Sequence, residues 1–147
     1  MSSVVPLISS GVAGPLGVLH LPRLWQKASL EARSKLAVGY PGCGQGYDQM
    51  VLTALGLCRD STLAYIASNR PSYPQFETWV AAQPGVKLDA ATVEGLNSSI
   101  RGYNHTDATR QGILTANGIP DDGKACKDAV NLNNLDDWFE FWTAELK

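Results

Sequence analysis

Hydrophobic residues recur every three or four positions through most of the chain, which is the pattern of helices that bury one face. The clearest example begins at Leu21, with Pro22 tolerated in the first turn because its missing N–H would have no partner there. Its apolar positions share one face: Leu21, Leu24, Trp25, Ala28, Ala32 and Leu36. Lys27, Glu31 and Lys35 form a charged ladder on another face. The pattern therefore predicts a long first helix.

Capping signals predict the next helices. One helix is expected over about residues 49–57, and a short one follows with Asp60 as its candidate cap. Ser72 and Gln75 have the spacing of a capping box, with a proline inside the first turn. Asp89 is expected to begin a further helix. These signals alternate with short connections, as in a helical domain.

The C-terminal third continues in the same way. Thr106 or Asp107 is expected to cap a helix that Gly118 stops. A new segment is expected to begin at residues 121–123. Residues 131–134 are expected to interrupt that segment before a final helix. That final helix carries a large apolar set: Leu135, Trp138, Phe139, Trp142 and Leu146.

The chain as a whole is expected to be all-α, because no alternating run of five or more residues indicates a strand. Residues 1–19 are small or apolar without a helical period, so we expect an extended N-terminal arm lying over the domain. Residues 20–147 would form the helical core. The sequence thus predicts one compact single domain of about six to eight short helices.

Net charge, the N-terminal pattern and the cysteines limit the expected binding partners and cellular compartment. Twelve basic and fourteen acidic residues give a formal net charge of −2, so no basic surface for nucleic acid is expected. The apolar N-terminus lacks a basic leader and is broken by prolines and glycines, so neither a signal peptide nor a membrane span is expected. Three cysteines in unrelated contexts favour free thiols in a reducing compartment, and hence a cytoplasmic protein.

The glycine-rich stretch at residues 39–48 is the strongest candidate for a site. Its glycines allow the backbone to pass close to a ligand or to another segment. Asp48 has two interpretations: it caps the helix that follows, or it lines a pocket together with Tyr40, Cys43 and Tyr47. The stretch lacks the Gly-x-x-x-x-Gly-Lys-Ser/Thr order of a phosphate-binding loop.

Several short motifs carry a family resemblance. In order they are Leu21-Pro22-Arg23-Leu24, Lys27-Ala28, Tyr47-Asp48-Gln49, Leu55-Gly56-Leu57 and Phe76-Glu77-x-Trp79. Over most of its length the chain resembles a family of short bacterial proteins, filed as domain of unknown function number five thousand and sixty-nine. The resemblance implies a small, soluble, stand-alone bacterial protein and brings no assigned activity. Arg23 and Asp48 match the family pattern, and the two could pair across the first two helices.

Two histidines, His20 and His105, lie in connections beside helix starts. Imidazole is well suited to proton transfer near neutral pH, although such histidines also serve as caps or surface residues. A metal site would need a third ligand such as Asp48 or Cys43, and no His-x-x-x-His spacing supports one, so neither a metal nor a cofactor is predicted. Cys43 is a candidate nucleophile, since a nearby helix N-terminus would lower its pKa.

These observations predict a small-molecule pocket bounded by His20, by the glycine-rich stretch ending at Asp48, and by the connection from Tyr103 to His105. His20 or His105 would move a proton, and Asp48 would orient the imidazole or act as the base. Arg23 or Arg110 would hold an anionic group. The expected substrate-binding set is Arg23, Trp25, Tyr40, Cys43, Tyr47, Tyr103 and Arg110.

Two functional classes follow. The first is a cofactor-independent enzyme that applies acid–base chemistry to a small organic substrate, as lyases, isomerases and hydrolases do. The second is a non-catalytic binding or protein-interaction module, which would have a solid core and an exposed apolar patch on the N-terminal arm or the final helix. A homodimer is compatible with either class.

Overall fold

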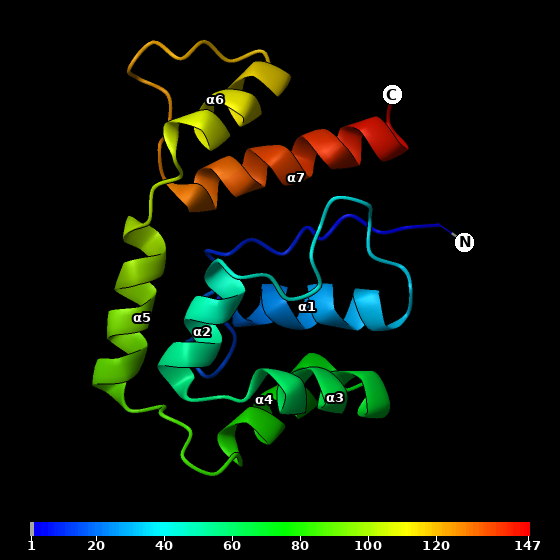
Figure 1. Ribbon diagram of the computed structural model, residues 1–147, viewed down its shortest axis with the longest axis vertical. Coiled ribbons are helices and arrows are strands. Elements are labelled where there is room, and N and C mark those ends of the chain that lie inside the picture. The colour runs from blue at the N-terminus through cyan, green and yellow to red at the C-terminus, as the bar shows by residue number, and fades with distance from the viewer. Residues whose placement is uncertain (1) are drawn as a thin grey trace.

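The computed structural model describes residues 2–147, which form seven α-helices and no strand (Figure 1). The helices are α1 (Leu21–Ala32), α2 (Tyr47–Leu55), α3 (Arg59–Asn69), α4 (Tyr73–Ala81), α5 (Ala90–Gly102), α6 (Asp107–Ala116) and α7 (Ala129–Glu145). The predicted all-α fold is therefore confirmed.

Helices α1 to α4 form the lower part of the molecule, and α5 connects this part to α6 and α7 (Figure 1). Helix α1 packs against α2, α3 and α4, while α2 also packs against α5. Helix α7 contacts α5 and α6. The arrangement leaves α7 on the opposite side of the glycine-rich stretch from the main core.

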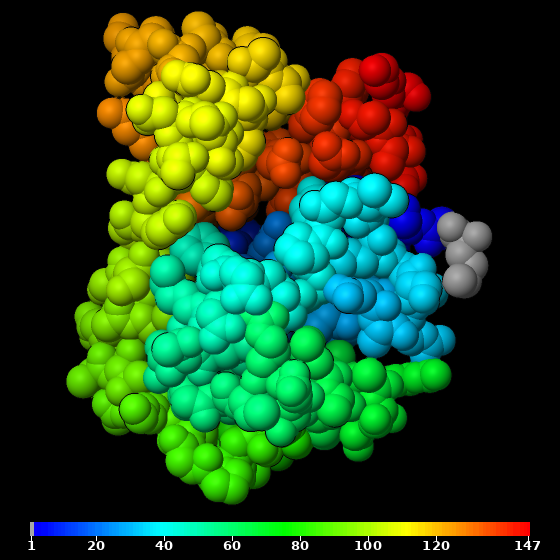
Figure 2. All heavy atoms as spheres, in the orientation of Figure 1, coloured from blue at the N-terminus to red at the C-terminus, as the bar shows by residue number. Residues whose placement is uncertain are grey.

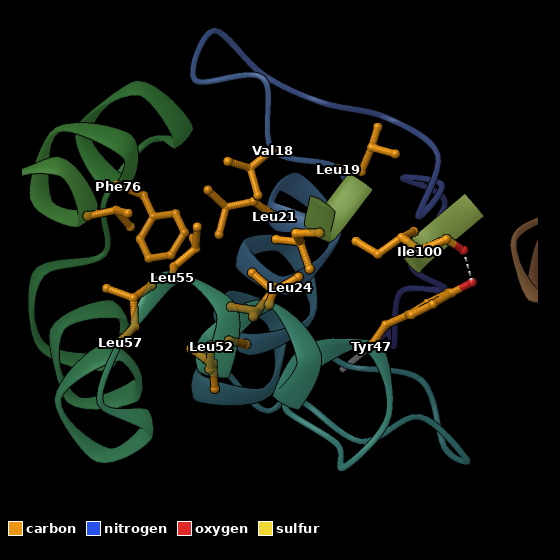
Figure 3. Close-up of a cluster of buried hydrophobic side chains, with 14 of the residues drawn as sticks. Val18, Leu19, Leu21, Leu24, Tyr47, Leu52, Leu55, Leu57, Phe76 and Ile100 are labelled. Atoms are coloured by element: carbon orange, nitrogen blue, oxygen red, sulfur yellow. Dashed lines mark hydrogen bonds between the residues drawn. The ribbon is translucent and has the colours of Figure 1, made fainter. Parts of the chain in front are cut away.

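One cluster of buried apolar side chains holds the lower part together (Figure 3). Its fully buried members include Val18, Leu21, Leu24, Val51, Leu55, Phe76, Val80 and Ile100. Each buried leucine or phenylalanine contributes about 1.5–3 kcal/mol relative to exposure. The Tyr47 hydroxyl donates to the carbonyl oxygen of Ile100 at 2.6 Å, which ties α2 to α5 (Figure 3).

Several predicted caps are present. Ser72 and Gln75 form the complete capping box of α4. Asp89 caps α5 by accepting a hydrogen bond from the Thr92 N–H. Thr106 is the cap of α6. The Asp60 cap is wrong, because α3 begins after Cys58 and Asp60 lies inside the first turn.

The first two helices have other bounds than expected. Helix α1 ends at Ala32, so the predicted extension to Leu36 is wrong; Leu36 instead forms an isolated bridge with Val4. Helix α2 starts at Tyr47 and ends at Leu55, followed by Gly56 with φ 74°. A left-handed glycine is a common way to end a helix, since it carries no Cβ.

Helix α7 runs without a break, so the predicted interruption at residues 131–134 is wrong. Asp128 caps it by accepting a hydrogen bond from the Asn131 N–H at 3.0 Å. Leu132 has no exposed surface, and its burial outweighs the modest helix propensity of the asparagines around it.

The extended N-terminal arm is not confirmed. Residues 2–19 contain no helix, yet the chain turns at residues 9–12 and again at residues 14–17. Side-chain oxygens of Gln26 and Asn97 accept hydrogen bonds from backbone N–H groups of this segment. The segment is therefore folded onto α1 and α5 by specific polar contacts.

The three cysteines, Cys43, Cys58 and Cys126, are free, as predicted. Within residues 2–147 no single helix is long and apolar enough to cross a membrane. Helices α2 and α3 reach that length and composition only jointly, with a bend of 104° between them.

Candidate functional site

A cavity of about 840 Å³ opens between the glycine-rich stretch, α2, α7 and the connection that precedes α6. Figure 2 shows the hollow between the orange-red atoms of α7 and the cyan-teal atoms of the stretch and α2. Its polar lining residues include His20, Arg23, Lys27, Tyr40, Tyr47, Asp48, Tyr103, His105, Asn133, Asp136 and Asp137. The volume falls in the range of small-molecule sites.

Seven of the residues singled out from the sequence line this cavity: His20, Arg23, Tyr40, Tyr47, Asp48, Tyr103 and His105. They come from segments far apart in the chain, and the fold brings them to one place. The other three, Trp25, Cys43 and Arg110, do not line it.

Each of these three has another role. The Trp25 indole N–H donates to the Pro71 carbonyl at 3.0 Å, on the core side of α1. Cys43 lines a separate cavity of about 790 Å³ between the end of α1 and α3. Arg110 forms an ion pair with Asp107 at 2.6 Å on the surface of α6. We therefore leave all three out of the candidate site.

The expected activation of Cys43 is also wrong. Burial raises the pKa of its thiol, and the nearby Asp48 carboxylate raises it further, although Arg59 and Lys27 act in the opposite direction. A raised pKa leaves little thiolate, which is the nucleophilic form.

The glycine-rich stretch is ordered by α3. The Arg59 guanidinium donates to the carbonyl oxygens of Cys43 and Gly44, each at 2.7 Å. Gly42 passes so close to α1 that a Cβ there would lie 1.6 Å from the Glu31 carboxylate oxygen. The close approach of Glu31 leaves no room for a side chain at Gly42, and the Arg59 hydrogen bonds hold the backbone that leads to Asp48.

Asp48 is buried at the inner end of the cavity, and its carboxylate accepts three hydrogen bonds. The donors are His20 Nε2 at 2.6 Å, Lys27 Nζ at 2.5 Å and the Gly44 N–H at 2.7 Å. The predicted helix cap is wrong, since Gly46 occupies that position. Burial alone would raise the pKa of Asp48, but the bonds and charges of His20 and Lys27 outweigh it and lower the pKa to about 2. Asp48 is a fixed anion.

His20 is held on both ring nitrogens. An ionised carboxylate only accepts, so Nε2 carries the proton toward Asp48, and Nδ1 accepts from the Ser10 hydroxyl at 2.9 Å. Its φ of 70° is uncommon for a residue other than glycine. Burial lowers the pKa of His20, against the opposing effect of Asp48. The imidazole is thus neutral and engaged, and has no free nitrogen for a ligand.

Ser10, His20 and Asp48 form a hydrogen-bonded chain of the residue types used by serine hydrolases. Ser10 is 1 % exposed and does not line the cavity. A nucleophile must reach its substrate, so this chain holds the N-terminal segment against α1 and α2 rather than presenting a reactive hydroxyl.

A second buried ion pair joins α1 to α7. Arg23 donates to the two Asp137 oxygens at 2.6 and 3.1 Å, and also to the carbonyl oxygens of Pro6 and Ile8. The Tyr40 hydroxyl donates to Asp137 at 3.1 Å. The predicted pairing of Arg23 with Asp48 is wrong, because each has another partner.

The opposite wall of the cavity is open. Tyr103 is 47 % exposed and packs edge-on against His105. His105 Nε2 lies 2.8 Å from Asn133 Oδ1, so a proton on Nε2 leaves Nδ1 as an acceptor. Asp136 is half-buried, and within residues 2–147 no basic side chain forms an ion pair with it. Burial raises the pKa of Asp136, and the charges of Asp137 and Glu140 raise it further, while Arg23 and His105 act in the opposite direction.

The sequence reasoning missed five lining or supporting residues: Ser10, Lys27, Asn133, Asp136 and Asp137. A signal existed on α7, where positions 133, 136 and 137 share one helical face. The sequence places Lys27 in a charged ladder with Glu31 and Lys35, and that pattern gives no sign of a buried ion pair. Ser10 carries no local signal.

The described part of the chain, residues 2–147, contains no group of three His, Cys, Asp or Glu side chains arranged to hold a metal ion. No protein-family model matches the chain, and no curated protein matches it. Membership in the bacterial family suggested by the short motifs therefore stays a prediction. The fold and the cavity define an all-α protein with one polar, solvent-open candidate site.

Proposed function

We propose that the cavity binds a small organic molecule, and that the protein is a cofactor-independent enzyme acting by acid–base chemistry. The observation that carries this proposal is a cavity of ligand size whose open wall brings together Tyr103 and His105, from the connection before α6, and Asn133 and Asp136 of α7. The open wall, rather than the inner one, holds the groups that can exchange protons.

His105 is the proton-transfer group in this proposal. Its bond to Asn133 fixes the ring orientation, and Nδ1 is left as an acceptor at the cavity wall. A neutral imidazole with one free nitrogen is a suitable general base near neutral pH. Asn133 is a positioning residue, since it acts through His105.

Asp136 is the second candidate. It lines the cavity, and its pKa is raised, first by burial, which brings its protonation closer to neutral pH. His20 and Asp48 take a different part from the one expected at the outset. Their polar atoms already form hydrogen bonds within the protein, and through these bonds they keep Lys27 and the glycine-rich stretch in place.

A second function, non-catalytic binding, is favoured by two observations. One is the exposure of Trp138 and Trp142 on the final helix, where this class predicts an apolar patch. The other concerns the inner wall. Two of the three residues expected to be catalytic, His20 and Asp48, are held in the closed network. A binding module needs only the shape and polarity of the cavity. Turnover separates the two functions.

The first experiment is a thermal-shift screen of small metabolites against the full chain and a cavity-blocking variant. Thr53→Trp adds a large side chain at an exposed lining position of α2, and Thr115→Trp on α6 is the matched control outside the cavity. A ligand at a hundred times its Kd stabilises the folded state by about 2.7 kcal/mol. We expect shifts with the unmodified chain and the control and none with Thr53→Trp. Equal shifts in all three proteins would contradict the proposal.

The second experiment follows each binder by proton NMR with substoichiometric protein. The enzyme proposal expects the compound to be converted, and expects His105→Ala to remove conversion while binding and melting temperature stay close to those of the unmodified chain. Binding without conversion would instead establish the binding module.

A further inference from the structure

The charges around the cavity are unequally matched. Apart from the imidazoles, the lining holds two basic side chains, Arg23 and Lys27, and three acidic ones, Asp48, Asp136 and Asp137. Arg23 is paired with Asp137, and Lys27 with Asp48. Asp136 forms no ion pair with a lysine or arginine of the described residues, although the charges of Arg23 and His105 act on it from a distance. Without the imidazoles, the lining therefore has one more acidic than basic side chain.

Asp136 is available to a ligand. It is half-buried on the face of α7 that also carries Asn133 and Asp137, and it lines the cavity, so a bound group can reach its carboxylate. Burial strengthens charge pairing because the local dielectric is lower than in water. The aromatic side chains nearby, Tyr40 and Tyr103, offer electron-rich faces that also attract cations.

An anionic ligand meets the opposite conditions. The Arg23 guanidinium already donates to Asp137 and to two backbone carbonyls, and Lys27 Nζ is 2.5 Å from Asp48. Both cations already face a buried carboxylate, so a ligand carboxylate or phosphate would add a second negative charge beside each pair instead of meeting an unpaired cation. The expectation that Arg23 holds an anionic group therefore has no support in the geometry.

We propose that the ligand of this cavity carries a cationic group, such as a protonated amine, that pairs with Asp136; this inference rests on the proposed function. The apolar part of such a ligand would lie against the tyrosines and against Met50 and Ala54. His105 lies on the same wall and is the internal side chain that would compete with the ligand for Asp136.

The test uses three probes of similar size and different charge: phenethylamine, phenethyl alcohol and phenylpropionate. Each is titrated at millimolar concentration into the full, isotope-labelled chain, and binding is followed by the backbone and imidazole resonances of the cavity. We expect the amine to bind most tightly and the carboxylate most weakly. Asp136→Asn should weaken the amine about tenfold, or about 1.4 kcal/mol, and leave the alcohol unchanged. Glu94→Gln on the exposed face of α5 removes the same charge outside the cavity and should change neither.

The outcomes separate the two proposals. Equal affinities for amine and carboxylate, or amine binding that Asp136→Asn does not weaken, would overturn the cationic preference and leave the cavity as a ligand site. The same holds if the metabolite screen yields an anionic ligand whose binding Thr53→Trp removes. No response at the cavity to any of the three probes, together with an empty screen, would overturn the proposed function and this inference with it.

Discussion

The two walls of the cavity use similar side chains in opposite ways. On the inner wall, His20 is 2 % exposed and both ring nitrogens have partners. On the outer wall, His105 is half-buried and only Nε2 has a partner among the described residues. Asp48 accepts three hydrogen bonds, whereas Asp136 has no ion-pair partner in the described chain.

The difference shows which wall maintains the structure and which is available for chemistry. A buried charge with a full set of partners is costly to disturb, and its protonation is fixed. A partly exposed group that still has a free hydrogen-bonding atom or an unpaired charge can bind a ligand or exchange a proton without loss of the fold. We therefore expect substitutions on the inner wall to change stability, and we propose that the outer wall carries the function.

The largest expected effect is that of Asp48→Asn on the inner wall. This substitution leaves Lys27 buried without its anion, and we expect the free energy of unfolding to fall by about 3–5 kcal/mol. Urea denaturation measures the loss. Glu94→Gln, an exposed neutralisation on α5, should stay within about 0.5 kcal/mol of the unmodified chain. A loss for Asp48→Asn as small as that of the control would remove the inner wall from the account.

The pair between α1 and α7 should have the next largest effect. Burial raises the pKa of Asp137 as it does that of Asp136, but Asp137 is the counter-charge of a buried guanidinium. Asp137→Asn retains one acceptor oxygen for Arg23 and leaves its charge unpaired, so we expect a loss of about 2–3 kcal/mol. Because this pair fastens α7, amide hydrogen exchange in α7 should accelerate more than exchange in α2. Uniform acceleration along the chain would show that the pair has no special role in holding α7.

The stability of the protein should fall as the pH is lowered below about 6.5. Burial lowers the pKa of His20 below that of an unfolded histidine. The charges of Lys27 and Arg23 lower it further, whereas Asp48 raises it. Between the folded and unfolded pKa values the unfolded chain binds more protons, so stability rises with pH and is lost on acidification, by at most about 1.4 kcal/mol per pH unit.

His20→Gln removes this titration, which involves about one proton per molecule. The free energy of unfolding of the variant should therefore vary less between pH 5 and pH 7 than that of the unmodified chain, as measured by urea denaturation at each pH. Asp48 makes a separate contribution to the pH dependence of stability, at lower pH than His20. Its pKa of about 2 means that its stabilisation is present above the unfolded value and is lost only as the pH falls toward 2. The same dependence on pH in the variant and the unmodified chain would contradict the assignment to His20.

The smallest effect on stability is expected on the outer wall. Asp136→Asn removes a carboxylate whose pKa is raised by burial, so at pH 7 the fold should be unchanged or slightly stabilised, within about 0.5 kcal/mol. Thermal and urea denaturation are sufficient to check this. A loss above about 1 kcal/mol would mean that Asp136 has a structural role, as Asp48 does.

Local signals explain what the sequence predicted correctly. The capping box at Ser72 and Gln75 and the caps at Asp89 and Thr106 depend on residues three positions apart. The continuous course of α7 was missed because three asparagines in four positions, at 131, 133 and 134, resemble a break, while the decisive burial of Leu132 is set by the tertiary fold.

The site was only partly predictable for the same reason. The residues at its three edges were found because polar side chains gathered in connections. Their partners were not, since Arg23 and Asp137 are separated by 114 positions and Lys27 lies on a helix with an apparently solvated charged face. Which distant charges form a pair is decided by how the helices pack, so it cannot be read from the spacing of residues along the chain.

The central claim is most directly tested by mapping the first ligand found in the metabolite screen on the isotope-labelled chain by NMR. We predict that the largest chemical-shift changes fall on residues 103–105 and 133–137, with smaller changes on residues 44–48 of the inner wall. Changes centred on the exposed Trp138 and Trp142 of α7, or on the separate cavity that Cys43 lines, would contradict the account.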